Sequence, residues 1–189
     1  MLETIEKIDC AVLLWIRNNA LSSSLIFVMR LLSFVSENGI IWIAASAAMM
    51  FKKKYRKNAA LVLAALLLSH IFANIIIKPA VSRPRPFIKY PQFTALTAPP
   101  AEFSFPSGHS TSSFAAAYFI GRADKKLGTA AYTAAVLIAL SRIYLFVHFP
   151  SDIIAGAVLG TLISALLGQS ADFGSYLLKP IKDTADIEK

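Results

Sequence analysis

Residues 58–77 read NAALVLAALLLSHIFANIII and contain no Asp, Glu, Lys or Arg. About 20 apolar residues, at ~1.5 Å per residue, are enough for a helix to cross the ~30 Å hydrocarbon core of a bilayer. Backbone polar groups inside a bilayer must be satisfied by the structure that spans it, which leaves helices and closed barrels. This one segment therefore favours a helical membrane protein.

The composition agrees with this interpretation. The chain has 189 residues, which favours one domain, and 56% of them are hydrophobic while 16% are charged. A soluble domain has about 25% charged residues. The net charge of +8 arises largely from basic residues that flank apolar segments, which indicates membrane topology and not a nucleic-acid partner. With Cys10 as the single cysteine, no intrachain disulfide is possible.

Five apolar segments follow one another along the chain. They cover residues 38–51, 58–77, 108–121, 128–147 and 152–168. The third segment is short for a full crossing, so we expect it to begin below the membrane surface, in a cavity lined by protein. The predicted fold is all-α, a polytopic membrane helical bundle with about five transmembrane helices.

Residues 1–36 differ from these segments because their charges are too closely spaced for a spanning helix. Glu6, Asp9, Arg17 and Arg30 interrupt apolar positions that recur at helical spacing. This pattern predicts an amphipathic segment of one or two helices lying in the membrane interface, with a short sixth span as the weaker alternative. The expected organisation is an interfacial segment (1–36), a membrane-embedded domain (37–170) and a cytoplasmic tail (171–189).

The loops between the segments predict the orientation. Five basic residues lie in 52–57 (KKKYRK), three lie in 122–126 (RADKK), and further lysines follow the fifth segment. With five spans all three groups lie on one side, which the positive-inside rule makes cytoplasmic. The 78–107 connection and the turn near 148–151 then face outside. A multi-pass protein of the cell membrane with an extracytoplasmic site is expected.

Three polar stretches lie at the outer ends of different segments: KPAVSRPRP (78–86), PSGH (106–109) and SRIYLFVHFPSD (141–152). Segments two to five can therefore bring them to one pocket. The cations Lys78, Arg85 and Arg142 suit the oxygens of a phosphate, arginine bidentately. Ser107 and Gly108 begin a helix whose free N–H groups and dipole favour an anion. Together they predict a phosphate-binding site.

Two histidines remain for a reaction at that phosphate. Pro150 suits the first helical position, which puts Asp152 in the first turn, where it can accept a hydrogen bond from one ring nitrogen of His148. That bond makes the other nitrogen a better nucleophile. His109 can protonate the leaving oxygen. The predicted chemistry is phosphoryl transfer through a phosphohistidine, followed by attack of water.

A metal-dependent reaction is the main competitor. Two-metal hydrolases need several carboxylates or histidines that converge. Near the three stretches the outer loops contain only Glu102 and Asp152 as acidic residues. No metal and no cofactor are therefore expected.

The three stretches resemble the signature motifs of the type 2 phosphatidic acid phosphatase superfamily: Lys78-x6-Arg85-Pro86, Pro106-Ser107-Gly108-His109 and Ser141-Arg142-x5-His148-x3-Asp152. The resemblance implies an integral membrane lipid phosphatase. It implies that His148 is phosphorylated, that Asp152 orients it, and that His109 is the general acid. The residues implied to bind phosphate are Lys78, Arg85, Ser107, Gly108 and Arg142.

A small protein of this kind looks most like an undecaprenyl diphosphate phosphatase within that family. The alternatives are a phosphatidylglycerophosphate or phosphatidate phosphatase, or a lipid phosphotransferase with the same site. A non-catalytic lipid-binding protein is disfavoured, because a binder needs no nucleophile. The expected partners are a lipid phosphate or diphosphate and the bilayer, without nucleic acid or metal.

Other residues receive structural interpretations. His70 is expected to pack or to form a hydrogen bond inside the bundle, facing away from the site. Gly156 and Gly160 form a GxxxG pattern that predicts close helix packing. Arg83 and Lys89 fall outside the motif pattern, and we expect them to attract anionic head groups or to lie at the interface.

Overall fold

A computed structural model describes the backbone of residues 2–177 and the side chains of residues 3–172. This part of the chain is helical, without strands, which confirms the predicted all-α class. Its helices are α1 (Leu2–Asn19), α2 (Ser23–Val35), α3 (Ile40–Met50), α4 (Arg56–His70), α5 (Lys78–Val81), α6 (Pro86–Lys89), α7 (Gly108–Ala123), α8 (Lys125–Tyr144) and α9 (Pro150–Leu177). Short 3₁₀ helices η1 (Glu37–Gly39) and η2 (Lys53–Tyr55) flank α3, and the π-helix η3 (Ile71–Ile77) joins α4 to α5.

The five apolar segments are all helical. Three helical stretches in the described residues are long and apolar enough to cross a membrane: Lys53–Lys89, Lys125–Tyr144 and Pro150–Asp172. A fourth is possible if Ser23–Val35 and Glu37–Met50, bent by 46° relative to each other, form one span. Helix α7, with 16 residues, is shorter than a full crossing, as predicted for the third segment.

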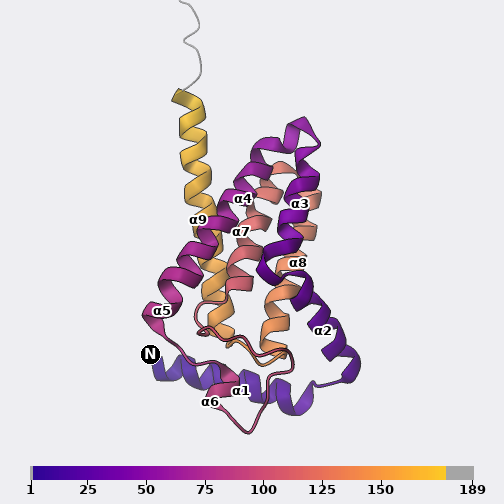
Figure 1. Ribbon diagram of the computed structural model, residues 1–189, viewed down its shortest axis with the longest axis vertical. Helices are drawn as coiled ribbons and strands as arrows, with labels where there is room; N and C mark the ends of the chain where they lie inside the picture. The colour runs from indigo at the N-terminus through magenta and orange to yellow at the C-terminus, as the bar shows by residue number, and fades with distance from the viewer. Residues whose placement is uncertain (1, 178–189) are drawn as a thin grey trace, which may run out of the picture.

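Helix α7 lies at the centre of the bundle and packs against α4, α8 and α9 (Figure 1). Ala115, Ala116, Ala117 and Phe119 of α7 are fully buried. On α9, a Cβ atom added at Gly156 would lie 2.6 Å from the carbonyl oxygen of Ser107, and one at Gly160 would lie 2.1 Å from that of Thr111. The absence of side chains there lets the two backbones touch, which confirms the predicted role of the GxxxG pattern.

Helix α1 crosses the foot of the bundle, transverse to the long helices (Figure 1). Its Leu13 and Asp9 are buried against the bundle, whereas Ile8 and Trp15 are more than half exposed. An apolar outer face on a transverse helix is what an interfacial position requires.

Residues 1–36 contain two helices in the structure, α1 and α2. Helix α2 packs against α8 and continues through the 46° bend into α3, so it belongs to the bundle and residue 36 lies at a bend. Arg30 had argued against a span here. Its Nε donates a 2.5 Å hydrogen bond to the carbonyl oxygen of Leu96, so the loop 90–107 supplies an acceptor for the guanidinium.

The connections gather at two ends of the bundle. The α3–α4 turn, the α7–α8 turn and the end of α9 lie at one end, and α1, α6 and the loop 90–107 lie at the other (Figure 1). The basic sequences at 52–57 and 122–126 thus share the end opposite the motifs. Helix α9 continues past the predicted domain boundary at 170 as far as Leu177, and the rest of the predicted tail, 178–189, lies outside the described residues.

Candidate functional site

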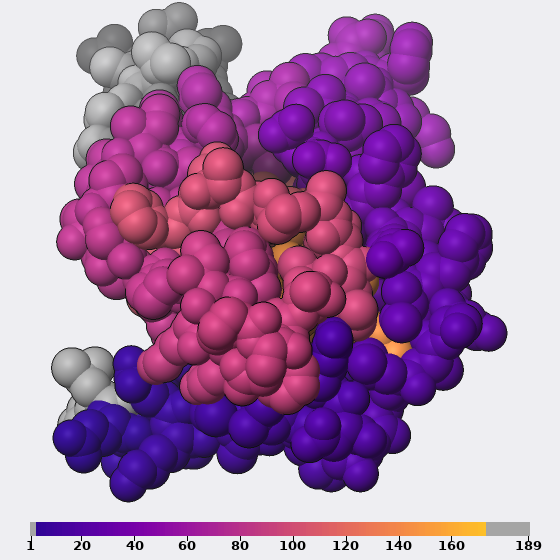
Figure 2. All heavy atoms as spheres, turned by 60° about the horizontal axis from the view of Figure 1, so that its bottom comes forward, coloured from indigo at the N-terminus to yellow at the C-terminus, as the bar shows by residue number. Residues whose placement is uncertain are grey.

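A cavity of about 780 Å³ opens at the end of the bundle where α1 lies. In the space-filling view of this end, the pink residues of the loop 90–107 lie across the middle of the face, and orange atoms are visible between them (Figure 2). Residues 97–102 of this loop line the cavity. Six of the eight predicted site residues line the cavity: Lys78, Arg85, Gly108, His109, Arg142 and His148. The other two, Ser107 and Asp152, lie behind this lining. The structure therefore brings the three motifs together.

The first motif lies where α4 changes its winding. The π-helix η3 ends at Ile77 and Lys78 follows directly, so the wider turn sets the direction of Lys78. Lys78 is buried, and its ammonium forms an ion pair with Glu102 of the outer loop. That hydrogen bond lowers the pKa of Glu102. Glu102 remains 60% exposed on its side chain, so this anion can leave the ammonium when another arrives.

Arg85 is 2% exposed and is held by backbone carbonyls. Its Nε donates to the carbonyl oxygen of Glu102 at 2.6 Å, and its Nη1 donates to that of Val147 at 2.9 Å. Carbonyl acceptors fix the guanidinium without neutralising its charge. The cation therefore remains available to an anion in the cavity.

The second motif begins α7. Ser107 is the N-cap residue, and its hydroxyl accepts hydrogen bonds from the backbone N–H and the hydroxyl of Ser110. The side chain of Ser107 therefore caps the helix and does not reach the cavity. Gly108 lines the cavity, and a Cβ atom there would lie 2.9 Å from Oδ1 of Asn74. Glycine thus keeps the N-terminus of α7 open to a ligand.

The third motif forms the turn between α8 and α9. The carbonyl oxygen of Arg142 accepts hydrogen bonds from the N–H groups of Val147 and His148, both at 3.2 Å. Phe146 adopts the left-handed conformation, with φ of 64°, which non-glycine residues rarely do. The Arg142 guanidinium donates to the hydroxyl of Ser33 on α2, and its Nε has no partner among the described residues. This buried cation can donate further hydrogen bonds into the cavity.

The ring of His148 is buried between a cation and a carboxylate. Arg85 Nη1 lies 3.2 Å from its Nε2, and since arginine only donates, Nε2 is the acceptor and Nδ1 carries the proton. Nδ1 faces Oδ2 of Asp152 at 3.5 Å, longer than an ordinary hydrogen bond. Burial lowers the pKa of His148 to about 3. Its imidazole is therefore neutral at pH 7, with the lone pair on the cavity side.

Asp152 is fully buried and has partners for both oxygens. Oδ2 accepts hydrogen bonds from Ser104 Oγ at 2.5 Å and from the N–H of Phe149 at 2.8 Å. The second of these ties the third residue of α9 to the residue before the helix, as in a capping box. Oδ1 accepts from Arg83 Nη1 at 2.6 Å. The carboxylate is therefore fixed beside His148.

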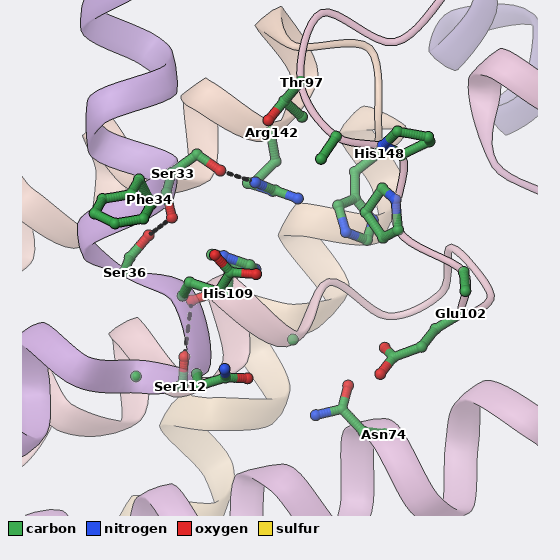
Figure 3. A pocket seen from close by; sticks show the side chains of 18 of the residues that line it. Ser33, Phe34, Ser36, Asn74, Thr97, Glu102, His109, Ser112, Arg142 and His148 are labelled. Carbon is green, nitrogen blue, oxygen red and sulfur yellow. Dashed lines mark hydrogen bonds between the residues drawn. The ribbon is translucent and has the colours of Figure 1, made fainter.

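His109 also lines the cavity, in the first turn of α7. Its Nε2 is buried and has no hydrogen-bond partner among the described residues. Figure 3 shows Arg142, His148 and His109 around one space, with Glu102 and Asn74 at its other side. A ring nitrogen without a partner at the wall of a polar cavity can exchange a proton with a ligand there.

The expectation that His70 faces away from the site is wrong. His70 is exposed and lines the same cavity, with its Nδ1 3.0 Å from Nδ2 of Asn74. Hydropathy alone does not specify which face of this apolar helix is turned toward a polar cavity. The cavity extends along α4 beyond the phosphate-binding residues, and the π-helix begins immediately after His70.

Sequence reasoning also missed three residues around Asp152. Ser104 and Arg83 bind its two oxygens, and Asp9 of α1 pairs with Arg83 Nη2 at 2.7 Å. No sequence pattern distinguishes Ser104 or Asp9 from other polar residues in a loop or an amphipathic helix. For Arg83, its position between Lys78 and Arg85 was the one sequence feature that placed it near the site.

The described residues contain no group of three or more His, Cys, Asp or Glu side chains placed to hold a metal ion. The cations and histidines are suited instead to a phosphoryl group. Lys78, Arg85, Arg142 and the N-terminus of α7 can bind its oxygens, and a neutral imidazole faces it. A second histidine is placed to move a proton.

Comparisons with known proteins agree with this chemistry. The family model of the PAP2 superfamily matches residues 58–172. The chain is 36% identical, over 73% of its length and 76% of the relative's, to decaprenylphosphoryl-5-phosphoribose phosphatase of Mycobacterium tuberculosis. It is 30% identical to undecaprenyl-diphosphatase of Sulfolobus acidocaldarius, over 76% of the chain and 71% of the relative.

A solved structure extends the likeness to nearly the whole fold. The chain is similar to the PAP2 type phosphatidylglycerolphosphate phosphatase of Bacillus subtilis, with a TM-score of 0.67 and 26% sequence identity. The match covers 95% of this chain and 88% of that one. It therefore includes most of the segment before residue 58, where the family model does not reach.

Proposed function

Because this chain belongs to the PAP2 superfamily of membrane phosphatases, we propose that it removes a phosphate group from a polyprenyl lipid, with undecaprenyl diphosphate as the first candidate substrate. The observation that carries the proposal is the cavity in which three buried cations and two histidines surround one space. Two relatives act, by name, on polyprenyl compounds, one a decaprenylphosphoryl sugar phosphate and one undecaprenyl diphosphate.

The reaction begins when the terminal phosphate displaces two internal contacts. Glu102 leaves the ammonium of Lys78, and Arg85 turns from Nε2 of His148 to the phosphate oxygens. The negative charge is then held by Lys78, Arg85 and Arg142 and by the N-terminus of α7. The freed lone pair on Nε2 of His148 faces the phosphorus atom.

In the first step, Nε2 of His148 forms a bond to phosphorus, and the bond from phosphorus to the leaving oxygen breaks. His109 donates a proton to that oxygen, so the leaving oxygen does not carry away a negative charge from the broken bond. Asp152 stabilises the positive charge that develops on the His148 ring. In the second step, the now neutral His109 takes a proton from water, whose oxygen forms a bond to phosphorus while the bond from phosphorus to Nε2 breaks. Inorganic phosphate and free His148 are released, and His109 is protonated again.

We also infer that the site faces the outside of the cell membrane. The basic sequences 52–57 and 122–126 lie at the end of the bundle opposite the cavity, and the positive-inside rule places them in the cytoplasm. The phosphate would then be released on the extracytoplasmic side, while the lipid product stays in the bilayer.

Phosphatidylglycerophosphate is the second candidate substrate. The similarity to the Bacillus subtilis phosphatase over 95% of this chain favours it. The same cavity can bind either phosphate, so the lipid portion decides between them.

Phosphate release by the purified protein in detergent, with EDTA present, tests the proposal. The lipids are undecaprenyl diphosphate, phosphatidylglycerophosphate and phosphatidate, and the control is His148→Ala. We expect release from undecaprenyl diphosphate to be fastest, to survive EDTA and to fall at least ~10³-fold in the variant. Release that needs an added acceptor would indicate a phosphotransferase. Release abolished by EDTA, or unchanged in His148→Ala, would contradict the mechanism.

A further inference from the structure

Arg83 lies outside the three motifs, yet its guanidinium joins two buried carboxylates from opposite ends of the chain. Nη1 donates to Oδ1 of Asp152 at 2.6 Å, and Nη2 donates to Oδ2 of Asp9 at 2.7 Å. Asp9 is 2% exposed and Asp152 is 0% exposed. The guanidinium also lies over the ring of Phe149, 4.1 Å from its centroid. A cation held this closely on three sides has one orientation.

The backbone of Arg83 serves the same carboxylate. Its carbonyl oxygen accepts a 2.8 Å hydrogen bond from the N–H of Ser104, and the hydroxyl of Ser104 donates to Oδ2 of Asp152. One residue therefore sets both oxygens of Asp152, one through its side chain and one through Ser104. The position of the Asp152 carboxylate beside Nδ1 of His148 depends on both.

Asp9 fixes the other side of this group. Its Oδ1 accepts from the N–H of Ser151 at 2.9 Å, its Oδ2 accepts from the hydroxyl of Ser151 at 2.5 Å, and that hydroxyl also accepts from Arg83 Nη1 at 2.8 Å. Helix α1 is thereby bound to the first turn of α9, one residue from Asp152. We call Asp9, Arg83, Ser151 and Asp152 the carboxylate clamp.

The charges in the carboxylate clamp explain why Asp9 is needed. Arg83 alone would cancel the charge of Asp152 and weaken its interaction with a positive ring on His148. With Asp9 the three ionised side chains sum to one negative charge, so Arg83 can fix the geometry while net negative charge remains beside His148. A buried carboxylate is costly unless it is paired, and Arg83 and Ser151 supply the partners of Asp9.

We propose that Arg83 and Asp9 are positioning residues for the His148–Asp152 pair, so that helix α1 is an integral part of the active site. This inference rests on the proposed function for the role of His148. Neither residue touches the substrate cavity, since neither contributes to its lining. Their effect should therefore fall on the chemical step, with substrate binding unchanged.

The kinetic test compares Arg83→Gln, Arg83→Lys and Asp9→Asn with a matched control, Lys89→Gln. Lys89 also pairs with an α1 carboxylate, Glu6, at 3.2 Å, but this pair is exposed and does not contact Asp152. We expect kcat to fall about 100-fold in Arg83→Gln and about tenfold in Asp9→Asn, with KM within about twofold of the wild type. Arg83→Lys should recover part of kcat, and Lys89→Gln should match the wild type.

A double-mutant cycle separates positioning from general stability. If Arg83 acts through Asp152, Arg83→Gln should cost less than about twofold in an Asp152→Ala background. An equal loss in both backgrounds, a change in KM alone, or an equal loss in Lys89→Gln would overturn the inference. Thermal unfolding of each variant identifies any that fail to fold. Arg83→Lys and Asp9→Asn, which preserve volume, then carry the test.

A spectroscopic readout keeps this test independent of turnover. The chain has 3 histidines, so ¹⁵N-histidine NMR of the detergent-solubilised protein can resolve the ring of His148, assigned with His148→Gln. Arg83→Gln and Asp9→Asn should shift its ring nitrogens, and Lys89→Gln should not. Unshifted signals would overturn the inference even if no lipid is hydrolysed, whereas inactive wild-type protein with shifted signals would contradict only the proposed function.

Discussion

Lys78 and Glu102 form an ion pair in the wall of a cavity that is otherwise rich in positive charge. The carboxylate of Glu102 is paired with the ammonium of Lys78, which the phosphate of a substrate would also need. It is 60% exposed and belongs to the outer loop, so it can move away at small cost. We therefore propose that Glu102 competes with the substrate phosphate for Lys78.

Replacing this competitor should strengthen anion binding. We expect Glu102→Gln to lower the inhibition constant for inorganic phosphate about two- to fivefold, since an ion pair with one exposed partner contributes about 1 kcal/mol. The measurement is inhibition of lipid hydrolysis across a phosphate titration. The control is Glu6→Gln, which removes a similarly exposed carboxylate paired with Lys89. Weaker inhibition in Glu102→Gln would show that Glu102 assists phosphate binding.

Much of the candidate site could be predicted from the sequence because its residues occur in short, ordered motifs. Lys78, Arg85, His109, Arg142 and His148 line one cavity, as predicted. Contacts that depend on distant parts of the chain could not be predicted. Asp9 and Asp152 are separated by 143 positions, and only the folded chain brings α1 to Arg83. The placement of His70 in the cavity wall likewise depends on how the helices pack.

At the scale of elements, the contact between α7 and α9 decides how the reacting groups are spaced. Helix α7 carries His109 near its start, and α9 carries Asp152 in its first turn. Gly156 and Gly160 bring the two backbones together just beyond these residues, and Ser164 donates to the carbonyl oxygen of Ala115 at 3.0 Å. Separation of the two helices would increase the distance between His109, the proposed general acid, and His148, the proposed nucleophile.

A methyl group at Gly160 should force that separation. Its Cβ atom would lie 2.1 Å from the carbonyl oxygen of Thr111, a backbone atom that cannot move aside alone. We expect Gly160→Ala to destabilise the protein by about 1–3 kcal/mol and to lower kcat. Thermal unfolding in detergent and lipid hydrolysis measure the two effects.

Gly168→Ala is the matched control, because it adds the same atom to the same helix. There the nearest atom is Nη1 of Arg122, at the end of a flexible side chain. This variant should retain activity and stability, with alanine favoured over glycine within a helix. If both variants behave alike, backbone contact between α7 and α9 is not what spaces the site.

The elements themselves followed from the sequence where a long apolar run specified them. The predicted 152–168 and 108–121 segments correspond to α9 and α7, and the predicted 58–77 segment corresponds to α4 with η3. The π-helix and the bend between α2 and α3 were not predictable, because hydropathy reports burial and not helix winding. The charge of Arg30 argued against a spanning helix, and its hydrogen-bond acceptor in the loop 90–107 could not be identified from the sequence.

At the scale of the whole molecule, the two ends of the bundle differ in composition and in structure. One end carries short basic turns, and the other carries the cavity, the loop 90–107 and α1 (Figure 1). The orientation proposed above, with the basic end in the cytoplasm, would account for both.

Cysteine labelling measures this orientation. In a Cys10→Ser background, we expect Gln92→Cys in the outer loop to react with a membrane-impermeant maleimide in right-side-out vesicles. Phe51 at the basic end is 87% exposed, and Phe51→Cys should react only after permeabilisation. Retained lipid hydrolysis shows that each variant is folded. The opposite labelling pattern would place the site in the cytoplasm.

The contact between α7 and α9 also bears on how such a protein could diversify. The two histidines and Asp152 are held by α7, α9 and the turn before α9, where even a methyl group is excluded. His70 and Asn74 belong instead to α4 and to its π-helical continuation η3, where the winding changes. Mutations that alter lipid preference are therefore expected to accumulate along α4, and the α7–α9 pair to remain under strong purifying selection. A new substrate could then be acquired without rebuilding the reaction.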